Sequence, residues 1–196
     1  MKIQALGIDG CFTIEHDVFP DGRGLFREWF KASEIEKLGI DFSIAQANFS
    51  VSKRGVIRGL HYSLAPEGQS KLVTCVQGVI TDVLVDIRTG SPTFMNKLNI
   101  KLESKSGKTL FIDSGVAHGF SVLSEIAAVC YLTSSEYSSN YEKSINPHDG
   151  ELNIDWCLPK GVQEIISESD LTSTSFSEAM IIGDLPNFAE MGSRID

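Results

Sequence analysis

The sequence has no apolar run that approaches the about 20 residues a membrane helix needs, and its start, MKIQALGIDG, lacks a signal-peptide pattern. We therefore expect a cytoplasmic protein with no membrane partner. The four cysteines, Cys11, Cys75, Cys130 and Cys157, form no C-x-x-C pair, so neither a zinc site nor a disulfide framework is indicated. We expect them to be small, mostly buried apolar residues.

Basic residues are also in deficit. The 196-residue chain has 17 lysines and arginines against 26 aspartates and glutamates, which gives a formal net charge of −9. Proteins that bind a nucleic-acid backbone usually display a basic face, so we expect no nucleic-acid partner. A small anionic ligand is still compatible with this charge, because a few arginines and lysines converging in one pocket can bind a diphosphate.

Helix signals are sparse, and one short segment carries the clearest of them. In KASEIEKLG, Ser33 is followed three residues later by Glu36 and Gly39 closes the segment, which predicts one short capped helix. After about residue 140 the chain turns polar, and SESDLTSTSFSEAM predicts a tail with at most short helical turns packed over the sheets. We expect a single domain over 1–196, with about 172–196 as the tail.

Short strand patterns fill most of the segment from residue 45 to residue 135. Runs of β-branched and apolar residues are separated by turn signals rich in Gly, Pro and Ser. Because little helix lies between them, an all-β double-sheet jelly roll is favoured over a parallel βαβ sheet. The clearest strand patterns are KLVTCVQ (71–77), VITDVLVDI (79–87), NKLNIKL (96–102), TLFID (109–113) and AAVCYLT (127–133).

Three segments combine charged and aromatic residues within this β-rich pattern. They are DGRGLFREWF (21–30), QANFSVSKRGVIRGLHY (46–62) and CYLTSSEY (130–137). Inward-facing residues of several strands meet at the open end of a jelly roll, so we expect a binding site there.

Each candidate in these segments has a structural interpretation beside the chemical one. His61 could be a general base or a hydrogen-bonded surface histidine, and Arg58 shares its face only if Gly59 bends the strand. Lys71 could stabilise an oxyanion inside the sheets or face solvent at an edge. Tyr131 could deliver a phenolic proton, or it could simply pack.

A metal site is not expected from the histidines. His16, His61, His118 and His148 are isolated from one another. Metal-binding jelly rolls of the cupin type usually place two histidines one residue apart with a carboxylate shortly after, and that pattern is missing here.

Taken in order, these segments, together with GQSKLV, DVLVDIRTGSPTF and GVAHGF, resemble the dTDP-4-dehydrorhamnose 3,5-epimerase family over roughly residues 5–170. Several independent motifs in the correct order make the resemblance specific, and the final residues lie outside it. The family implies a cupin-like jelly roll, the double-stranded β-helix, that forms a homodimer and needs neither metal nor organic cofactor. Its substrate is dTDP-4-dehydro-6-deoxy-D-glucose, which is inverted at C3″ and C5″.

The resemblance implies four catalytic residues. His61 matches the base and Asp170 its paired carboxylate, while Tyr131 matches the acid on the opposite face of the sugar. Lys71 matches the group that stabilises the enolate oxygen. These residue types suit the chemistry, because a proton beside a ketone becomes removable only when the developing enolate charge is stabilised.

The resemblance also implies a binding set. Residues 21–30 resemble an arm donated across the dimer interface, and the planar fork of Arg58 suits a diphosphate. For His118 and Asp82, a supporting role in the site and a purely structural role are both open. The substrate-binding residues implied are Arg23, Phe26, Glu28, Gln46, Asn48, Arg58, His118 and Tyr137.

The sequence departs from the family pattern at three places. Ser63 stands where many members have glutamine, Thr74 where they have arginine, and Cys157 where a proline follows the tryptophan. These departures leave room for a relative that epimerises only one carbon or accepts another 4-keto-6-deoxysugar nucleotide. Three competing functions are a non-catalytic sugar-nucleotide binder, a metal-dependent cupin enzyme and a ketoisomerase of the same substrate.

Overall fold

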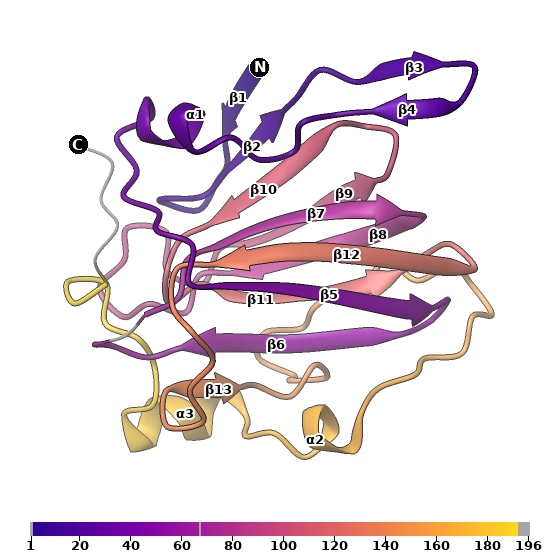
Figure 1. Ribbon diagram of the computed structural model, residues 1–196. Coiled ribbons are helices and arrows are strands. Elements are labelled where there is room, and N and C mark those ends of the chain that lie inside the picture. The colour runs from indigo at the N-terminus through magenta and orange to yellow at the C-terminus, as the bar shows by residue number, and fades with distance from the viewer. Residues whose placement is uncertain (1, 67, 192–196) are drawn as a thin grey trace.

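Two antiparallel β-sheets lie face to face in the computed structural model, which describes residues 2–66 and 68–191 (Figure 1). Glu67 and residues 192–196 of the predicted tail lie outside the described residues. The six-stranded sheet has the order β1 (Lys2–Ala5), β2 (Phe12–Glu15), β10 (Lys108–Ile112), β7 (Lys71–Gln77), β12 (Ile126–Thr133) and β5 (Gln46–Lys53). The five-stranded sheet has the order β13 (Glu142–Ser144), β6 (Ile57–Ser63), β11 (Ala117–Val122), β8 (Val79–Val85) and β9 (Lys97–Glu103).

Apart from these sheets, the described chain has a two-stranded hairpin and three short helices. The hairpin pairs β3 (Phe19–Asp21) with β4 (Gly24–Phe26) and projects beyond the two sheets (Figure 1). The helices are α1 (Ala32–Glu36), α2 (Glu168–Leu171) and α3 (Phe176–Ile182). No helix among the described residues is long and apolar enough to cross a membrane.

The predicted all-β jelly roll is confirmed, since the strands form two packed antiparallel sheets. All five of the strand patterns quoted from the sequence form strands, and the edge strand β9 exposes every second residue along most of its length. The capping prediction for the first helix was wrong. Lys31, not Ser33, is the N-cap of α1, and its side chain makes no capping hydrogen bond.

The core lies between the sheets. Val73 and Cys75 of β7 pack there against Ile80, Leu84 and Phe120 of the opposite sheet, and each is at most 5% exposed. Side chains alternate between the two faces of a strand, so residues i and i+2 point the same way. Lys71, two positions before Val73, therefore also points between the sheets.

The outer faces of the sheets are covered unequally. Residues of the C-terminal segment, among them Trp156, Phe176 and Leu185, cover the five-stranded sheet with a second apolar cluster. On the outer face of the six-stranded sheet, Phe49 and Val51 of the edge strand β5 are 64% and 55% exposed. Among the cysteines, Cys11 and Cys75 are buried as expected, Cys130 is partly buried, and Cys157 is exposed, contrary to expectation.

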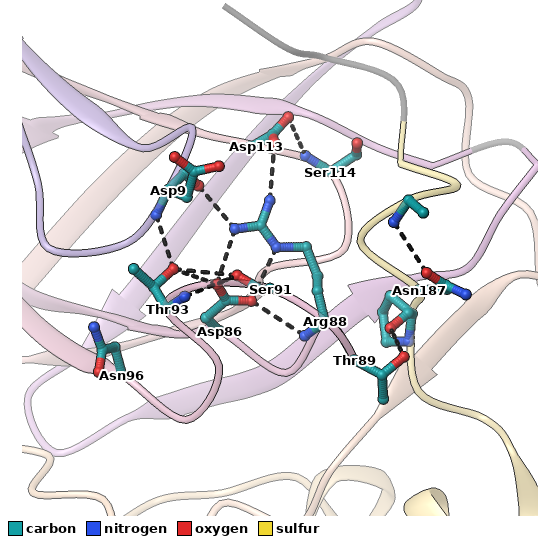
Figure 2. A network of polar contacts seen from close by, with 12 residues as sticks. Asp9, Asp86, Arg88, Thr89, Ser91, Thr93, Asn96, Asp113, Ser114 and Asn187 are labelled. Carbon is teal, nitrogen blue, oxygen red and sulfur yellow. Dashed lines mark hydrogen bonds and ion pairs between the residues drawn. The ribbon is translucent and has the colours of Figure 1, made fainter.

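Within the motif DVLVDIRTGSPTF, the residues from Asp86 to Thr93 form a buried polar network (Figure 2). The Arg88 side chain is fully buried, and its Nε donates to Asp86 Oδ1 at 2.9 Å while Nη1 donates to Asp113 Oδ2 at 2.9 Å. Nη2 also donates to the carbonyl of Asp9, which ties the β1–β2 turn to the β8–β9 connection. Two carboxylates compensate the desolvation of one guanidinium, so this part of the motif is structural.

Candidate active site

A cavity of about 400 Å³ is formed by residues from both sheets and from α2. Its lining includes seven of the residues that were predicted from the sequence. They are Gln46, Asn48, His61, Lys71, Tyr131, Tyr137 and Asp170.

Strand register explains why residues distant in the sequence meet in this cavity. Tyr131 lies opposite Val73 on β7 and opposite Asn48 on β5. Because Val73 points inward, Lys71, two positions before it on the same strand, points inward too. Tyr131 and Asn48, which lie level with Val73 on the neighbouring strands, point the same way. Three neighbouring strands of one sheet thus present a lysine, a phenol and an amide to the same space.

His61 and Asp170 form a hydrogen-bonded pair although 109 positions separate them. His61 Nε2 lies 2.8 Å from Asp170 Oδ1, and the two side chains are 44% and 10% exposed. Burial alone would raise the pKa of Asp170, but the hydrogen bond from His61 and the charge of that imidazole hold it below its ordinary value. A carboxylate bonded to one imidazole nitrogen fixes the tautomer and stabilises the imidazolium that forms on proton abstraction.

The bend that the sequence required at Gly59 is present. In the pairing of β6 with β11, His61 lies opposite His118 and Arg58 opposite Phe120, with a register shift between them. Three steps on β6 therefore match two steps on β11, which is a β-bulge. The bulge turns Arg58 and His61 toward the same face.

Lys71 is buried inside the six-stranded sheet rather than at an edge. Its strand β7 lies between β10 and β12, and the residue is 7% exposed. Burial lowers the pKa of Lys71, and the charges of Glu142 and Asp82 oppose that effect. An ammonium in this position is suited to a developing anionic oxygen, since it is poorly hydrated and aimed into the cavity.

Tyr131 and Glu142 are both driven toward their protonated forms. Burial raises the pKa of the Tyr131 phenol, while the nearby Arg58 charge lowers it. Burial also raises the pKa of Glu142, and the charges of Lys71 and His61 lower it. A phenol that keeps its proton is suited to act as an acid.

A second histidine–carboxylate pair lies deeper than the first. His118 Nε2 lies 3.0 Å from Asp82 Oδ2, and Asp82 is fully buried. Burial raises the pKa of Asp82, while the His118 and Lys71 charges lower it. His118 therefore stands behind His61 on the neighbouring strand, but it is not among the residues that line the cavity.

Five predicted binding residues do not line the cavity of their own chain. Two of them, Arg58 and His118, lie on β6 and β11 beside the site, and the other three lie in or next to the hairpin. Arg23 lies in the exposed turn of the hairpin, where it pairs with Asp21, and Phe26 is 64% exposed. Glu28 follows the hairpin and pairs with Lys31 at 3.9 Å.

The hairpin is anchored to the outer face of the six-stranded sheet. Arg27 Nη2 donates to Thr74 Oγ1 at 3.0 Å and to the Cys75 carbonyl at 2.9 Å. Thr74, which departs from the family pattern, thus holds the base of the arm.

Five further residues line the cavity and were not found from the sequence. They are Gln69, Glu142, Lys143, Ser144 and Ser169. Gln69 could have been found, because it precedes Lys71 by two positions and thus shares its face if the strand starts early. The others lie in polar segments without periodicity, where the sequence carries no signal of burial.

Two further observations concern a metal site and a second cavity. Among the described residues, no group of three or more His, Cys, Asp or Glu side chains is placed to hold a metal ion. A larger cavity of about 560 Å³ is mostly apolar and is lined by residues such as Ile3, Phe12 and Phe188, and none of the predicted site residues borders it.

Comparisons with known proteins identify the family of this chain. The family model of dTDP-4-dehydrorhamnose 3,5-epimerase matches residues 5–178, so the family extends past the predicted limit of 170 into α3. A dTDP-4-dehydrorhamnose 3-epimerase from Streptomyces niveus is 40% identical over 190 residues, which cover 96% of this chain and 90% of the relative.

Solved structures give the same result. The rmlC epimerase of Mycobacterium tuberculosis superposes with a TM-score of 0.91 at 38% identity, covering 97% of this chain and 96% of that one. The dTDP-6-deoxy-D-glucose-3,5-epimerase of Legionella pneumophila, solved with dTDP-4-keto-L-rhamnose, has a TM-score of 0.88 at 38% identity, covering 95% and 98%. The chain therefore belongs to the dTDP-4-dehydrorhamnose 3,5-epimerase family.

Proposed function

We propose that this protein is an isomerase that inverts C3″ and C5″ of dTDP-4-dehydro-6-deoxy-D-glucose. The observation that carries the proposal is the hydrogen-bonded pair of His61 and Asp170 in one cavity with Lys71 and Tyr131. A sugar-nucleotide binder without catalysis has no need for these four groups together. The names of similar proteins, including a 3,5-epimerase solved with dTDP-4-keto-L-rhamnose, support this substrate class.

Each inversion proceeds through an enolate. His61 removes the proton on the carbon beside the C4″ ketone, and the electron pair of that C–H bond moves onto the ketone oxygen. Lys71 stabilises the charge that develops there, because a fixed cation is effective in a water-poor site. Tyr131 then donates its proton to the opposite face of the carbon, and the ketone is restored with inverted configuration.

Inversion at a single carbon is the second candidate. The relative from Streptomyces niveus is a 3-epimerase, and other relatives at 35% identity are dTDP-4-dehydro-6-deoxyglucose 3-epimerases. The same base, acid and lysine serve one carbon or two, so the difference lies in how the sugar is presented to them.

We further propose that the active form is a homodimer in which residues 21–30 of one chain complete the cavity of its partner. Three observations support this. Arg23 and Phe26 are exposed and do not line the cavity of their own chain, the hairpin projects beyond the sheets (Figure 1), and Phe49 and Val51 leave apolar surface on β5. A cytoplasmic location stays a prediction from the sequence.

Exchange in heavy water tests the reaction. The protein is incubated with dTDP-4-dehydro-6-deoxyglucose, and NMR of the product locates the deuterium. We expect deuterium at both C3″ and C5″ with inverted configuration. Deuterium at one carbon supports the restricted epimerase, and a folded protein that incorporates none contradicts the catalytic proposal for this substrate.

The base is tested by substitution in the same assay. We expect His61→Ala to abolish exchange at both positions, because no other residue is proposed to remove the proton. His148→Ala is the matched control, since His148 is exposed, does not line the cavity and pairs with Glu164 at 3.0 Å. Near-normal exchange by His61→Ala would show that the base is misassigned.

A further inference from the structure

The carboxylate of the catalytic pair is carried by a very short helix. α2 spans only Glu168–Leu171. A helix of one turn has little stability of its own, because nucleation fixes several residues for few hydrogen bonds. The position of Asp170 is therefore set by what holds α2 to the rest of the molecule, together with the hydrogen bonds of its carboxylate to His61, Ser167 and the Gly59 backbone.

A pair of serine hydroxyls connects α2 to the sheet at the position of His61. Ser144 of β13 lies directly opposite His61 in the pairing of β13 with β6. Its Oγ lies 2.7 Å from Ser173 Oγ, and Ser173 Oγ lies 2.9 Å from the Ser169 carbonyl. Ser169 is the residue before Asp170, and Asp170 bonds to His61. The contacts therefore form a closed ring that runs from His61 through Ser144, Ser173, Ser169 and Asp170 back to His61.

The direction of the hydrogen bonds in this ring follows from the proton count. A hydroxyl has one proton, and Ser173 donates its proton to the Ser169 carbonyl. Ser173 must then accept in the hydroxyl pair, and Ser144 donates. Replacing Ser144 by alanine removes the only proton available for that link.

We propose that Ser144 is a positioning residue for the reaction, acting through Ser173 to hold Asp170 against His61. The Ser144 hydroxyl bonds to Ser173 and not to His61 or Asp170. Through Ser173 it attaches the segment that carries Asp170 to β13, the strand that pairs with His61. This inference rests on the proposed function, since it assumes that the pair of His61 and Asp170 removes the proton.

A second attachment makes the inference testable without loss of the fold. The Asn146 side-chain Nδ2 donates to the Leu171 carbonyl at 2.6 Å, and the Asn146 backbone N–H donates to the Thr174 carbonyl at 2.9 Å. These contacts hold the end of α2 when the hydroxyl pair is lost. We therefore expect Ser144→Ala to stay folded while Asp170 gains freedom to leave His61.

The experiment measures exchange kinetics and their pH dependence. We expect Ser144→Ala to lower kcat about tenfold with little change in KM, because a small displacement of a reacting group is costly in the transition state. The acid limb of kcat/KM should move to lower pH, because the imidazolium loses part of the stabilisation that the carboxylate gives. Ser144→Thr, which keeps a hydroxyl, should restore both.

Ser173→Ala supplies an independent route to the same link. We expect it to lose at least as much activity as Ser144→Ala, because it removes both the hydroxyl pair and the hydrogen bond to the Ser169 carbonyl. We expect the double variant to be no worse than Ser173→Ala, because the hydroxyl pair is already lost in that variant. Ser177→Ala is the control, since Ser177 bonds to Glu151 on the surface, and it should match the wild type.

The outcomes separate this inference from the function on which it rests. If the wild type shows no exchange, the proposed function fails. If the wild type exchanges and Ser144→Ala and Ser173→Ala both match it in kcat and in pH profile, the inference alone is wrong. A loss in Ser144→Ala with an unshifted acid limb and no recovery in Ser144→Thr would also contradict it, since it would reflect general damage.

Discussion

At the scale of single residues, the site contains ionisable groups whose protonation states suit different tasks. Burial lowers the pKa of Lys71 and raises the pKa of Tyr131. The phenol thus keeps its proton to a higher pH than usual, whereas the amine loses its proton at a lower pH than usual. The alkaline loss of activity should therefore report Lys71 rather than Tyr131.

This assignment predicts the behaviour of Lys71 variants. Exchange should fall on the alkaline side below the ordinary lysine pKa of about 10.4. We expect Lys71→Met to reduce exchange by about 10²- to 10³-fold and to remove that limb, because the enolate loses its cation. Lys71→Arg should shift the limb to higher pH, since arginine keeps its charge.

The pH profile of exchange and the melting temperature are the measurements. Lys71→Met should melt no lower than the wild type, because it removes a charge whose burial is unfavourable. An unchanged alkaline limb in Lys71→Met would contradict the assignment.

Residue types alone could not reveal the proposed catalytic pair. His61 and Asp170 are common polar residues, and nothing in their local sequence says that they meet at 2.8 Å. Motif order identified both of them, whereas Glu142 and Ser144 lie in a polar segment that gave no signal. Contacts between distant loops depend on packing that has no local periodicity.

At the scale of elements, the bulge in β6 depends on a close approach of two strands. A Cβ built on Gly59 would lie 2.7 Å from the Gly119 Cα and 2.7 Å from the His118 carbonyl oxygen. Gly59 also has a φ of +115°, which side chains rarely tolerate. Only glycine lets β6 and β11 approach here while Arg58 and His61 turn to one face.

We therefore expect Gly59→Ala to lower the free energy of unfolding by about 2 kcal/mol or more, and to reduce exchange by disturbing the register of His61. Urea denaturation measures the first effect. Gly150→Ala is the control, because nothing lies within 4 Å of a Cβ built there. Equal stability of the two variants would contradict this account of the bulge.

Elements with strong alternation were predictable, and those held by tertiary contacts were not. The pattern of 71–77 corresponds to β7 residue for residue, because its apolar positions face the core. The cap of α1 was mispredicted because the spacing of Ser33 and Glu36 is only a local signal. The helix starts earlier, with Lys31 as its N-cap, and in that position Ile35 packs into the core. Tertiary packing of an apolar residue overrides a local capping preference.

At the scale of the whole molecule, the proposed dimer makes a prediction about mixed subunits. Arg23→Ala should impair exchange by removing a contact of the arm, and His61→Ala should abolish it by removing the base. If arms are exchanged, a mixed dimer of these two chains has one site with both defects and one site with none. Activity should thus return on mixing.

Co-expression of the two variants with different tags, followed by the exchange assay, measures this effect. Random pairing gives mixed dimers in half of the molecules, so about a quarter of the wild-type activity is expected. A mixture no more active than its parents would show that each chain completes its own site. An Arg23→Ala protein with full activity would show that the arm does not bind the substrate.

The two-sheet architecture was accessible from strand and turn patterns, whereas the dimer is implied by the family resemblance alone. Repeated short strands with turn signals are specific for packed antiparallel sheets, which the structure has. The strand pattern does not say whether Arg23 and Phe26 meet solvent or a partner, because an exposed aromatic on a hairpin looks the same in both cases.

The projecting β3–β4 hairpin also affects how this protein should be handled. If every site borrows its arm from a neighbour, turnover per chain depends on protein concentration, since dilution separates the subunits before it unfolds them. A weak rate in a very dilute sample would then measure dissociation rather than poor chemistry. Rates should accordingly be compared at several protein concentrations, with the plateau taken as the property of the enzyme.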